Sequence, residues 1–336
     1  MQKNINWFSI YVKMSDYANM SEVYFLSIKT KEFVEGIGRL FDKALEGIVK
    51  KGDLVAVKVH FGERGNTSFI RPEFLKPVIE KIKEKGGKPF LTDTNTLYVG
   101  HRGNSVDHFY TALLHGFGAL QTPIIIADGL TGKSSIDIDI KGILLKKVKI
   151  GLDIVNADSM IVISHVKGHM ATGMGGAIKN TGMGCASRAG KQHQHSSTKP
   201  IVNKKLCTAC KICSRWCSVN AISYNSGKAS IDHGLCVGCG ECTVSCPSGA
   251  LEIRWDTSTQ DLQAKMAEYA LGAVMNKRVG YINFLINIVP DCDCWNKSDN
   301  AIVPDIGALA SKDIVAIDKA SFDLVNSSKG IKTNRL

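Results

Sequence analysis

The sequence predicts an α/β fold in which a mainly parallel sheet, covered by helices on both faces, is interrupted by a small α+β insertion. Short apolar runs alternate with helical stretches over the first half of the chain, as expected for a buried parallel sheet. A segment rich in glycine, lysine and histidine, and then in cysteine, breaks that pattern. The α/β pattern returns after Trp255, so we expect the cysteine-rich segment to lie within one α/β domain.

Each expected element follows from its local pattern of apolar residues. We expect strands at 22–29, 53–60, 88–93, 123–128, 159–165, 279–288, 301–303 and 313–317, with two edge strands or a hairpin in 136–149. Helices are expected at 31–50, 72–85, 105–116, 151–157, 259–275 and 320–326. The chain then divides into an N-terminal extension (1–21), a first α/β part (22–200), the insertion (201–255) and a second α/β part (256–336). Two independent α/β halves are the alternative, but the second part is short for a sheet of its own.

Composition limits the classes of function. The chain of 336 residues has a formal charge of +11, yet its lysines are spread out and form no dense basic tract interleaved with aromatics. This disfavours nucleic acid and favours small anionic ligands or acidic redox partners. We expect no membrane span and, because the start lacks a signal pattern, a cytoplasmic protein. Eleven cysteines in such a chain indicate metal binding or chemistry rather than disulfides.

Eight of the cysteines form two copies of the motif C-x2-C-x2-C-x3-C. The copies are Cys207, Cys210, Cys213 and Cys217, followed by Cys236, Cys239, Cys242 and Cys246. Every position of the first copy recurs 29 residues later, so the motif is an internal repeat. A four-thiolate zinc site is the alternative, but it draws on two C-x2-C pairs and leaves the third cysteine of each copy unexplained.

This spacing resembles that of bacterial ferredoxins with two 4Fe–4S clusters. The resemblance implies that three cysteines of each copy hold one cluster and that the fourth reaches across to the other. One cluster would then be bound by Cys207, Cys210, Cys213 and Cys246, and the other by Cys236, Cys239, Cys242 and Cys217. Ser218 departs from the usual proline, which shapes a turn but is not a ligand.

Polar residues follow the expected strands of the α/β domain where each strand ends. His60, Asp93, Asp128 and His165 each end one strand, and 291–294 (Asp-Cys-Asp-Cys) and Asp305 follow two more. Because the carboxyl ends of parallel strands share one edge of the sheet, where such folds bind ligands, we take the first four as candidate catalytic or proton-handling groups. The alternative for any single residue is a turn or a helix cap.

The glycine-rich segment 172–195 suggests an anion site. Glycines beside cations allow backbone N–H groups at a helix start to hold an anionic cofactor or substrate. We therefore expect a binding role for Lys167, Gly175, Gly176, Lys179 and Asn180. The spacing fits neither a Walker loop nor a G-x-G-x-x-G fingerprint, and a structural glycine turn is the alternative.

Three cysteines lie outside the repeat. Cys185, Cys292 and Cys294, together with His165 and His169, could supply a further single-metal site. The alternative is a set of free thiols and solvated histidines. Cys292 and Cys294 are only two residues apart, which we expect to be strained for a mutual disulfide.

Most of the chain, roughly 22–330, resembles the domain of unknown function 362 family. The segments that carry the resemblance are 165–169 (His-Val-Lys-Gly-His), 175–180 (Gly-Gly-Ala-Ile-Lys-Asn), 182–186 (Gly-Met-Gly-Cys-Ala) and 291–294. The resemblance implies an α/β fold with an embedded two-cluster ferredoxin. It implies no particular reaction.

These observations lead to one functional hypothesis with two rivals. We expect an iron–sulfur oxidoreductase that passes electrons between an external carrier, either a partner protein or a small molecule, and a site at the carboxyl edge of the sheet. The first rival is a non-catalytic electron-transfer or redox-sensing protein whose α/β domain docks a partner. The second, a nucleic-acid protein with structural clusters, is favoured only by the charge.

Overall fold

The structure is a computed structural model of the chain. It describes residues 8–12, 21–98, 100–195, 199–217, 219–236, 240–252 and 259–331. Among these residues, no helix combines the length and the apolar character needed to cross a bilayer.

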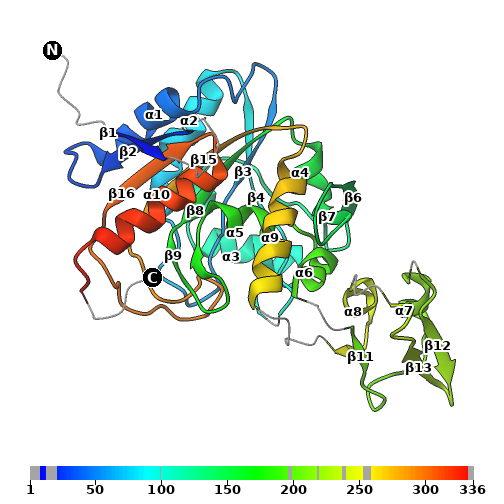
Figure 1. Cartoon of the computed structure of the whole chain (residues 1–336). Helices are drawn as coiled ribbons and strands as arrows, with labels where there is room; N and C mark the ends of the chain where they lie inside the picture. The colour runs from blue at the N-terminus through cyan, green and yellow to red at the C-terminus, as the bar shows by residue number, and fades with distance from the viewer. Residues whose placement is uncertain are drawn as a thin grey trace.

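An eight-stranded sheet forms the centre of the α/β domain (Figure 1). Its strands, in spatial order, are β1 (Phe8–Val12), β2 (Ser21–Ser27), β16 (Gly307–Ser311), β15 (Arg278–Leu285), β8 (Ser159–His165), β3 (Leu54–Lys58), β4 (Lys88–Asp93) and β5 (Ile124–Ile126). The five strands from β15 to β5 are mutually parallel, and the other three continue the sheet with antiparallel pairs. The predicted α/β class with a mostly parallel sheet is therefore confirmed.

Helices cover both faces, and a separate apolar core lies beneath each layer. Their bounds are α1 (Phe33–Ala44), α2 (Lys76–Glu84), α3 (Ser105–Leu114), α4 (Leu152–Asn156), α5 (Ala177–Gly182), α6 (Arg188–His195), α9 (Thr259–Val274) and α10 (Ile314–Ser327), with 3-10 turns η1 (Pro72–Phe74) and η2 (Phe117–Leu120). In β8, Ile161 and Ile163 face the core under α1 and α2, whereas Met160 and Val162 face the core under α9 and α10. This alternation explains why a strand buried on both faces reads as one continuous apolar run.

The C-terminal part corrects two expected strands. Residues 313–317, expected to be a strand, begin helix α10, and the strand here is the preceding β16. Asp313 is the N-cap of α10, because its carboxylate accepts hydrogen bonds from the backbone N–H groups of Val315 (2.9 Å) and Ala316 (3.0 Å). Residues 301–303 form no strand. A short apolar run is compatible with either a strand or a helix, and here the N-cap at Asp313 identifies the helix.

The expected N-terminal extension also contains structure. Within 1–21, Phe8–Val12 form β1, which pairs antiparallel with β2 at the edge of the sheet. Smaller pairs lie elsewhere in the domain: β6 (Ser135–Asp139) with β7 (Lys147–Gly151), and β9 (Lys167–His169) with β10 (Gly173–Gly175). The first of these is the hairpin expected in 136–149.

The insertion is a small α+β unit. It contains β11 (Ile201–Val202), α7 (Ile212–Arg215), β12 (Ile222–Asn225), β13 (Lys228–Ile231), α8 (Glu241–Ser245) and β14 (Leu251–Glu252). β12 and β13 form a hairpin, and β11 pairs with β14. The first and last elements of the insertion, β11 and β14, therefore lie side by side.

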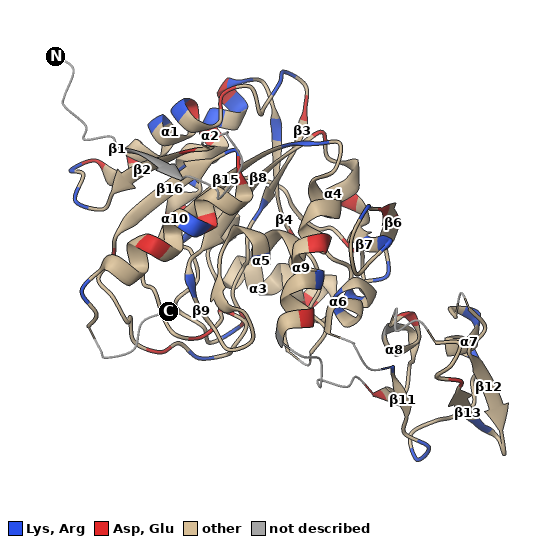
Figure 2. Cartoon of the chain, viewed as in Figure 1, with Lys and Arg blue, Asp and Glu red and all other residues tan. Residues whose placement is uncertain are grey.

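The insertion lies beside helix α6 of the α/β domain (Figure 1). Lys149 of β7 forms an ion pair with Glu241 of α8 (3.3 Å), and the Lys133 ammonium lies over the ring of Trp216 (5.5 Å). Gly240 packs so closely on Gln192 of α6 that a Cβ there would come within 2.3 Å of its side chain. In Figure 2, acidic and basic positions are interspersed along the outer helices.

The cap of α10 provides a test of this fold. Replacing Asp313 by alanine removes two capping hydrogen bonds, and we expect the free energy of unfolding to fall by about 1–2 kcal/mol. Urea denaturation followed by circular dichroism measures the change. Asp323→Ala, an exposed site on the same helix that forms an ion pair with Lys319, is the control and should cost less than about 0.5 kcal/mol. Equal losses for both variants would contradict the capping role.

Candidate functional site

Two cavities in the insertion separate the cysteines into two groups. The first cavity encloses about 300 Å³, including the space at its mouth, and Cys207, Cys210, Cys213 and Cys246 are among its lining residues. Its other walls are largely apolar, with Val202, Ala229, Ala250 and Leu251. One cysteine of the second motif therefore lies with three of the first.

The second cavity is the counterpart of the first. It encloses about 330 Å³ and is lined by Cys217 from the first motif together with Cys236 and Cys242 from the second. Cys239, the remaining member of this expected set, lies outside the described residues. All the described cysteines of the insertion are free thiols, so no disulfide competes for them.

Backbone N–H groups point at several of these sulfur atoms. The N–H of Ala221 donates to Cys217 Sγ (3.2 Å), and that of Ala229 donates to Cys207 Sγ (3.4 Å). Backbone donors, first of all Ala229, hold the pKa of the Cys207 thiol below its ordinary value, because they stabilise the thiolate. The Tyr224 hydroxyl lies 3.3 Å from Cys213 Sγ. These cavities are thus arranged for thiolates.

A second polar region lies at the carboxyl ends of β3 and β4. Lys58 and Asp93 form an ion pair (3.0 Å) in which both side chains are almost fully buried. Burial alone would raise the pKa of Asp93, but Lys58 and the neighbouring cations hold it well below its usual range. The Lys58 ammonium also donates to Asn180 Oδ1 (2.7 Å), which ties this pair to α5.

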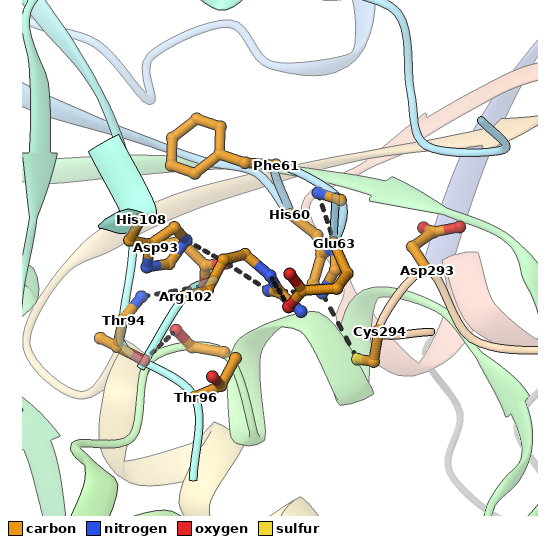
Figure 3. Close-up of polar contacts among 12 residues, drawn as sticks. His60, Phe61, Glu63, Asp93, Thr94, Thr96, Arg102, His108, Asp293 and Cys294 are labelled. Carbon is orange, nitrogen blue, oxygen red and sulfur yellow. Dashed lines mark hydrogen bonds and ion pairs between the residues drawn. The ribbon is translucent and has the colours of Figure 1, made fainter. Parts of the chain in front are cut away.

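Arg102 connects Asp93 to the histidine that follows β3. Figure 3 shows its guanidinium between Asp93 and His60, at 3.8 Å from the carboxylate and 3.0 Å from His60 Nε2. Glu63 also pairs with Arg102 (3.2 Å), and His108 lies 3.7 Å from Asp93. We call Lys58, His60, Glu63, Asp93 and Arg102 the carboxyl-edge network.

Sequence analysis missed four residues of this region, Lys58, Glu63, Arg102 and His108. Arg102, Glu63 and His108 come from loops and from α3, where no periodicity distinguishes a buried charge from a solvated one. Lys58 carried a signal, because a lysine inside the apolar run of β3 must be paired if it is buried.

Asp128 lies at the same edge but has different partners. Its Oδ1 accepts hydrogen bonds from Asn95 N (2.9 Å) and Asn95 Nδ2 (2.8 Å), and its Oδ2 has no hydrogen-bond partner in the described part of the chain. Burial raises the pKa of Asp128 to about 6. Lys191, whose burial lowers its pKa to about 8, is the cation that opposes this rise most strongly.

His165 lies on the other side of the network, where it supports the loop after β15. Its Nδ1 lies 2.9 Å from the carboxylate of Asp293, which also pairs with Lys167 (2.9 Å). Its Nε2 faces two backbone carbonyls, those of Ile286 and Asn287. The ring therefore holds the loop in place through Asp293, which lies between Cys292 and Cys294.

Cys292 and Cys294, the thiol pair, face each other with their sulfur atoms 2.9 Å apart. Lys179 donates to Cys292 Sγ (3.4 Å), and His60 Nε2 lies 3.5 Å from Cys294 Sγ (Figure 3). The hydrogen bond from Cys294 and the charge of Lys179 hold the pKa of the Cys292 thiol well below its usual range, although burial opposes this.

The glycine-rich segment is organised differently from the expectation of an external anion. The first N–H groups of α5, those of Ala177 and Ile178, donate to the carboxylate of Asp318 at 2.7 and 2.8 Å. At Gly176, a Cβ would come within 2.4 Å of that carboxylate, so glycine is needed for the close approach. Gly176 therefore faces an anion supplied by α10, whereas Gly175 packs against Lys167 and Lys179, which point to the thiol pair and its loop.

Of the residues expected at a single-metal site, Cys292 and Cys294 lie together, but the set does not form one site. Cys185 is fully buried in the core beneath α9 and α10, where burial raises its pKa to about 11. His169 Nδ1 accepts from the N–H groups of Ala171 and Thr172 (3.2 Å each). Within the described ranges, no group of three or more His, Cys, Asp or Glu side chains is arranged to hold one metal ion.

Known proteins provide three partial sequence matches. The chain is 29% identical over 159 residues to the thylakoid-associated protein sll1697 of Synechocystis, and this alignment covers 46% of each protein. It is 39% identical over 69 residues to the indolepyruvate oxidoreductase subunit IorA of Pyrococcus horikoshii, covering 19% of this chain and 11% of that subunit. It is 32% identical over 85 residues to the pyruvate synthase subunit PorD of Thermotoga maritima, covering 25% of this chain and 83% of PorD. The chain thus spans about half of sll1697 and a small part of IorA.

Solved structures include a distant likeness. The lactate racemase apoprotein of Thermoanaerobacterium thermosaccharolyticum aligns with a TM-score of 0.44 and 14% identity, over 88% of this chain and 56% of that one. A Thermotoga maritima protein aligns with a TM-score of 0.41 and 11% identity, over 86% of this chain and 57% of that one.

The family model described as a domain of unknown function (DUF362) matches residues 55–323, which is most of this chain. The chain therefore belongs to that family.

Proposed function

We propose that the protein is an iron–sulfur oxidoreductase that binds two 4Fe–4S clusters in the insertion and exchanges electrons at the carboxyl edge of its sheet. The observation that carries the proposal is the separation of the cysteines into two cavities that match the cross-motif sets. A bound cluster of this type supplies one-electron transfer. The proposal treats 201–255 as a domain inserted between 22–200 and 256–336, which the pairing of β11 with β14 supports.

The chemistry of the cavity walls supports iron–sulfur ligation. Cys207, Cys210, Cys213 and Cys246 would hold one cluster, and Cys217, Cys236, Cys239 and Cys242 the other. Ligation requires thiolates, and the backbone donors at Cys207 and Cys217 favour that form. The same donors would tune the reduction potential by hydrogen bonding to sulfur. Apolar residues such as Leu251 line the first cavity.

At the carboxyl edge, the chain's own residues are suited to holding and moving protons. Burial, followed by the charge of Arg102, lowers the pKa of His60, so its ring is neutral near pH 7. Burial raises the pKa of Asp128 to about 6, which suits this carboxylate to proton exchange near neutral pH. We assign His60 and Asp128 to proton handling, Asp93 to fixing Arg102 and Lys58, and His165 to positioning Asp293.

An acidic redox partner is the third part of the proposal. PorD and IorA are named as subunits of a pyruvate synthase and an indolepyruvate oxidoreductase, which favours a role beside another redox protein. The insertion exposes four basic side chains, Lys204, Lys205, Lys211 and Arg215. Such a cluster would steer an acidic electron carrier toward the cavities.

A non-catalytic electron-transfer protein is the second candidate. One observation favours it: the charged groups of the carboxyl-edge network pair with one another and are buried, with Arg102 only 1% exposed. A substrate would have to displace these pairs. The thiol pair favours the enzyme, because Cys294 is partly exposed and carries reactive sulfur to the surface.

Iron content tests the proposed ligand sets. Anaerobically reconstituted protein should contain about eight iron and eight sulfide ions, the content of two 4Fe–4S clusters. Removing two cysteines of the same set should cost only the cluster that this set binds. We therefore expect Cys207→Ser with Cys246→Ser to retain about four iron ions, because both residues line the first cavity.

The matched control variant combines Cys207→Ser with a cysteine of the other set. Cys207→Ser with Cys217→Ser should lose nearly all iron, because these residues line different cavities. Iron and acid-labile sulfide are measured after desalting, with circular dichroism to confirm that the α/β domain remains folded. The reverse result, four ions in the second variant and none in the first, would show that each motif binds its own cluster. Zinc in place of iron would reject the proposal.

The basic surface makes a separate prediction about the partner. Replacing Lys204, Lys205, Lys211 and Arg215 together by glutamine should slow electron transfer from a reduced acidic ferredoxin about tenfold at low salt, because steering is lost. At about 0.5 M salt the difference should vanish, since screening removes steering from both proteins. Stopped-flow absorbance of the clusters measures the rate.

A control variant changes the same charge elsewhere. Lys50, Lys51, Lys76 and Lys83 are exposed on the α/β domain, and their joint replacement by glutamine should leave the rate within about twofold of wild type. Equal slowing by both variants would mean that net charge, and not a docking surface on the insertion, controls the encounter.

A further inference from the structure

The thiol pair has a geometry that the spacing of its cysteines did not suggest. The sulfur atoms of Cys292 and Cys294 are 2.9 Å apart, and a disulfide at about 2.05 Å would need them to approach by only about 0.9 Å. Two cysteines separated by one residue are strained in an extended chain. Here the chain turns, because Trp295 N–H donates to Cys292 O (3.1 Å), and the turn brings both side chains to one side.

We infer that Cys292 and Cys294 form a reversible disulfide, a two-electron thiol couple that exchanges with small disulfide compounds. This goes beyond the proposed cluster binding and does not depend on it. The couple lies in the loop after β15, at the carboxyl edge that we propose as the reactive site.

Buried positive charge favours the reduced, thiolate form of Cys292. The Lys179 ammonium lies 3.4 Å from its sulfur, and Lys167 is held nearby by Asp293. The thiolate of Cys292 in turn raises the pKa of Lys179 against the effect of burial, so the two groups stabilise each other's charge. Thiolates are the nucleophiles of thiol–disulfide exchange, so this contact prepares Cys292 to react.

Cys294 is the sulfur that an outside compound reaches. It is partly exposed, whereas Cys292 is only 6% exposed. His60 Nε2 lies 3.5 Å from Cys294 Sγ and 3.0 Å from Arg102 Nη1, which brings a buried positive charge near Cys294 as well.

The exchange balances with a small disulfide, R–S–S–R, as the oxidant. The Cys294 thiolate attacks one sulfur, forms a mixed disulfide and releases one R–S⁻, which takes up a proton. The Cys292 thiolate then attacks Cys294 Sγ, closes the internal disulfide and releases the second R–S⁻. Two electrons leave the pair and two R–SH molecules are formed. The reverse reaction uses two R–SH, or one dithiol, as the reductant.

The surrounding charges favour this couple over a metal ion. Lys179 donates to Cys292 Sγ, and Arg102 lies 3.0 Å from His60 Nε2, the nitrogen that a metal shared with Cys294 would need. A divalent cation would have to enter beside two buried cations, which repel it.

Differential alkylation of the whole, cluster-loaded protein tests the inference. The protein is equilibrated anaerobically in glutathione buffers of stepped ratio, free thiols are blocked, and the peptide carrying both residues is analysed by mass spectrometry. We expect alkylation of both sulfurs to decrease together as the ratio of oxidised to reduced glutathione rises. The dependence on that ratio should be that of a two-electron couple. A pair that stays fully alkylated in the most oxidising buffer would overturn the inference, and so would a pair protected by bound zinc or iron.

Two variants sharpen the result. In Cys292→Ala, Cys294 should accumulate as a stable mixed disulfide with glutathione, because no second thiolate resolves it. In Lys179→Met, loss of the ammonium destabilises the thiolate, so the equilibrium constant for disulfide formation should rise about tenfold, or about 30 mV for two electrons. Lys265→Met, a partly buried lysine on α9 not among the groups acting on the pair, is the control and should leave the constant unchanged. An unchanged constant in Lys179→Met would remove Lys179 from the couple.

Because alkylation reads only this peptide, the result is independent of iron content. Loss of iron with normal exchange would reject the cluster proposal alone. Normal iron content with no exchange would reject the thiol couple alone.

Discussion

The parallel pairing of β8 with β15 is the contact on which the rest of the molecule depends. These strands are neighbours in the sheet, although the whole insertion lies between them in the sequence. Because they run in the same direction, His165 at the end of β8 and the loop after β15 emerge at the same edge. The contact of His165 with Asp293 then fixes that loop, and the thiol pair reaches its position beside His60. Site geometry is thus a direct result of strand direction.

The parallel pairing of β8 with β15 also constrains the insertion. A segment placed between two adjacent parallel strands must begin and end without disturbing the layers that cover the sheet. β11 and β14 satisfy this by pairing with each other, so the insertion is closed at its base and touches the domain mainly through α6 and α8. The contact of Gly240 with Gln192 lies there, beside the second cavity. The insertion therefore contacts the α/β domain through helix α6.

The sequence predicted the elements whose apolar pattern is strong and missed those decided by single contacts. β4 and β8 have the expected bounds because runs of buried residues specify them. The helix that begins after Asp313 was misassigned because its first turn is apolar and short, and only the cap identifies it. In the site, His60 and Asp93 were found from their places after strands. Arg102 was not, because no local pattern marks a loop arginine that pairs with residues from two strands.

The carboxylate of Asp318 at the start of α5 has a consequence for ligand choice. In nucleotide-binding α/β proteins, a glycine-rich turn leaves the first N–H groups of a helix free for a phosphate. Here α10 supplies the negative group from within the chain, Asn283 holds it in place (2.8 Å), and the glycines serve the close approach of two helices. A phosphorylated cofactor would have to expel a buried side chain to bind there. The fold keeps the glycine-rich turn but uses it to fasten its C-terminal helix.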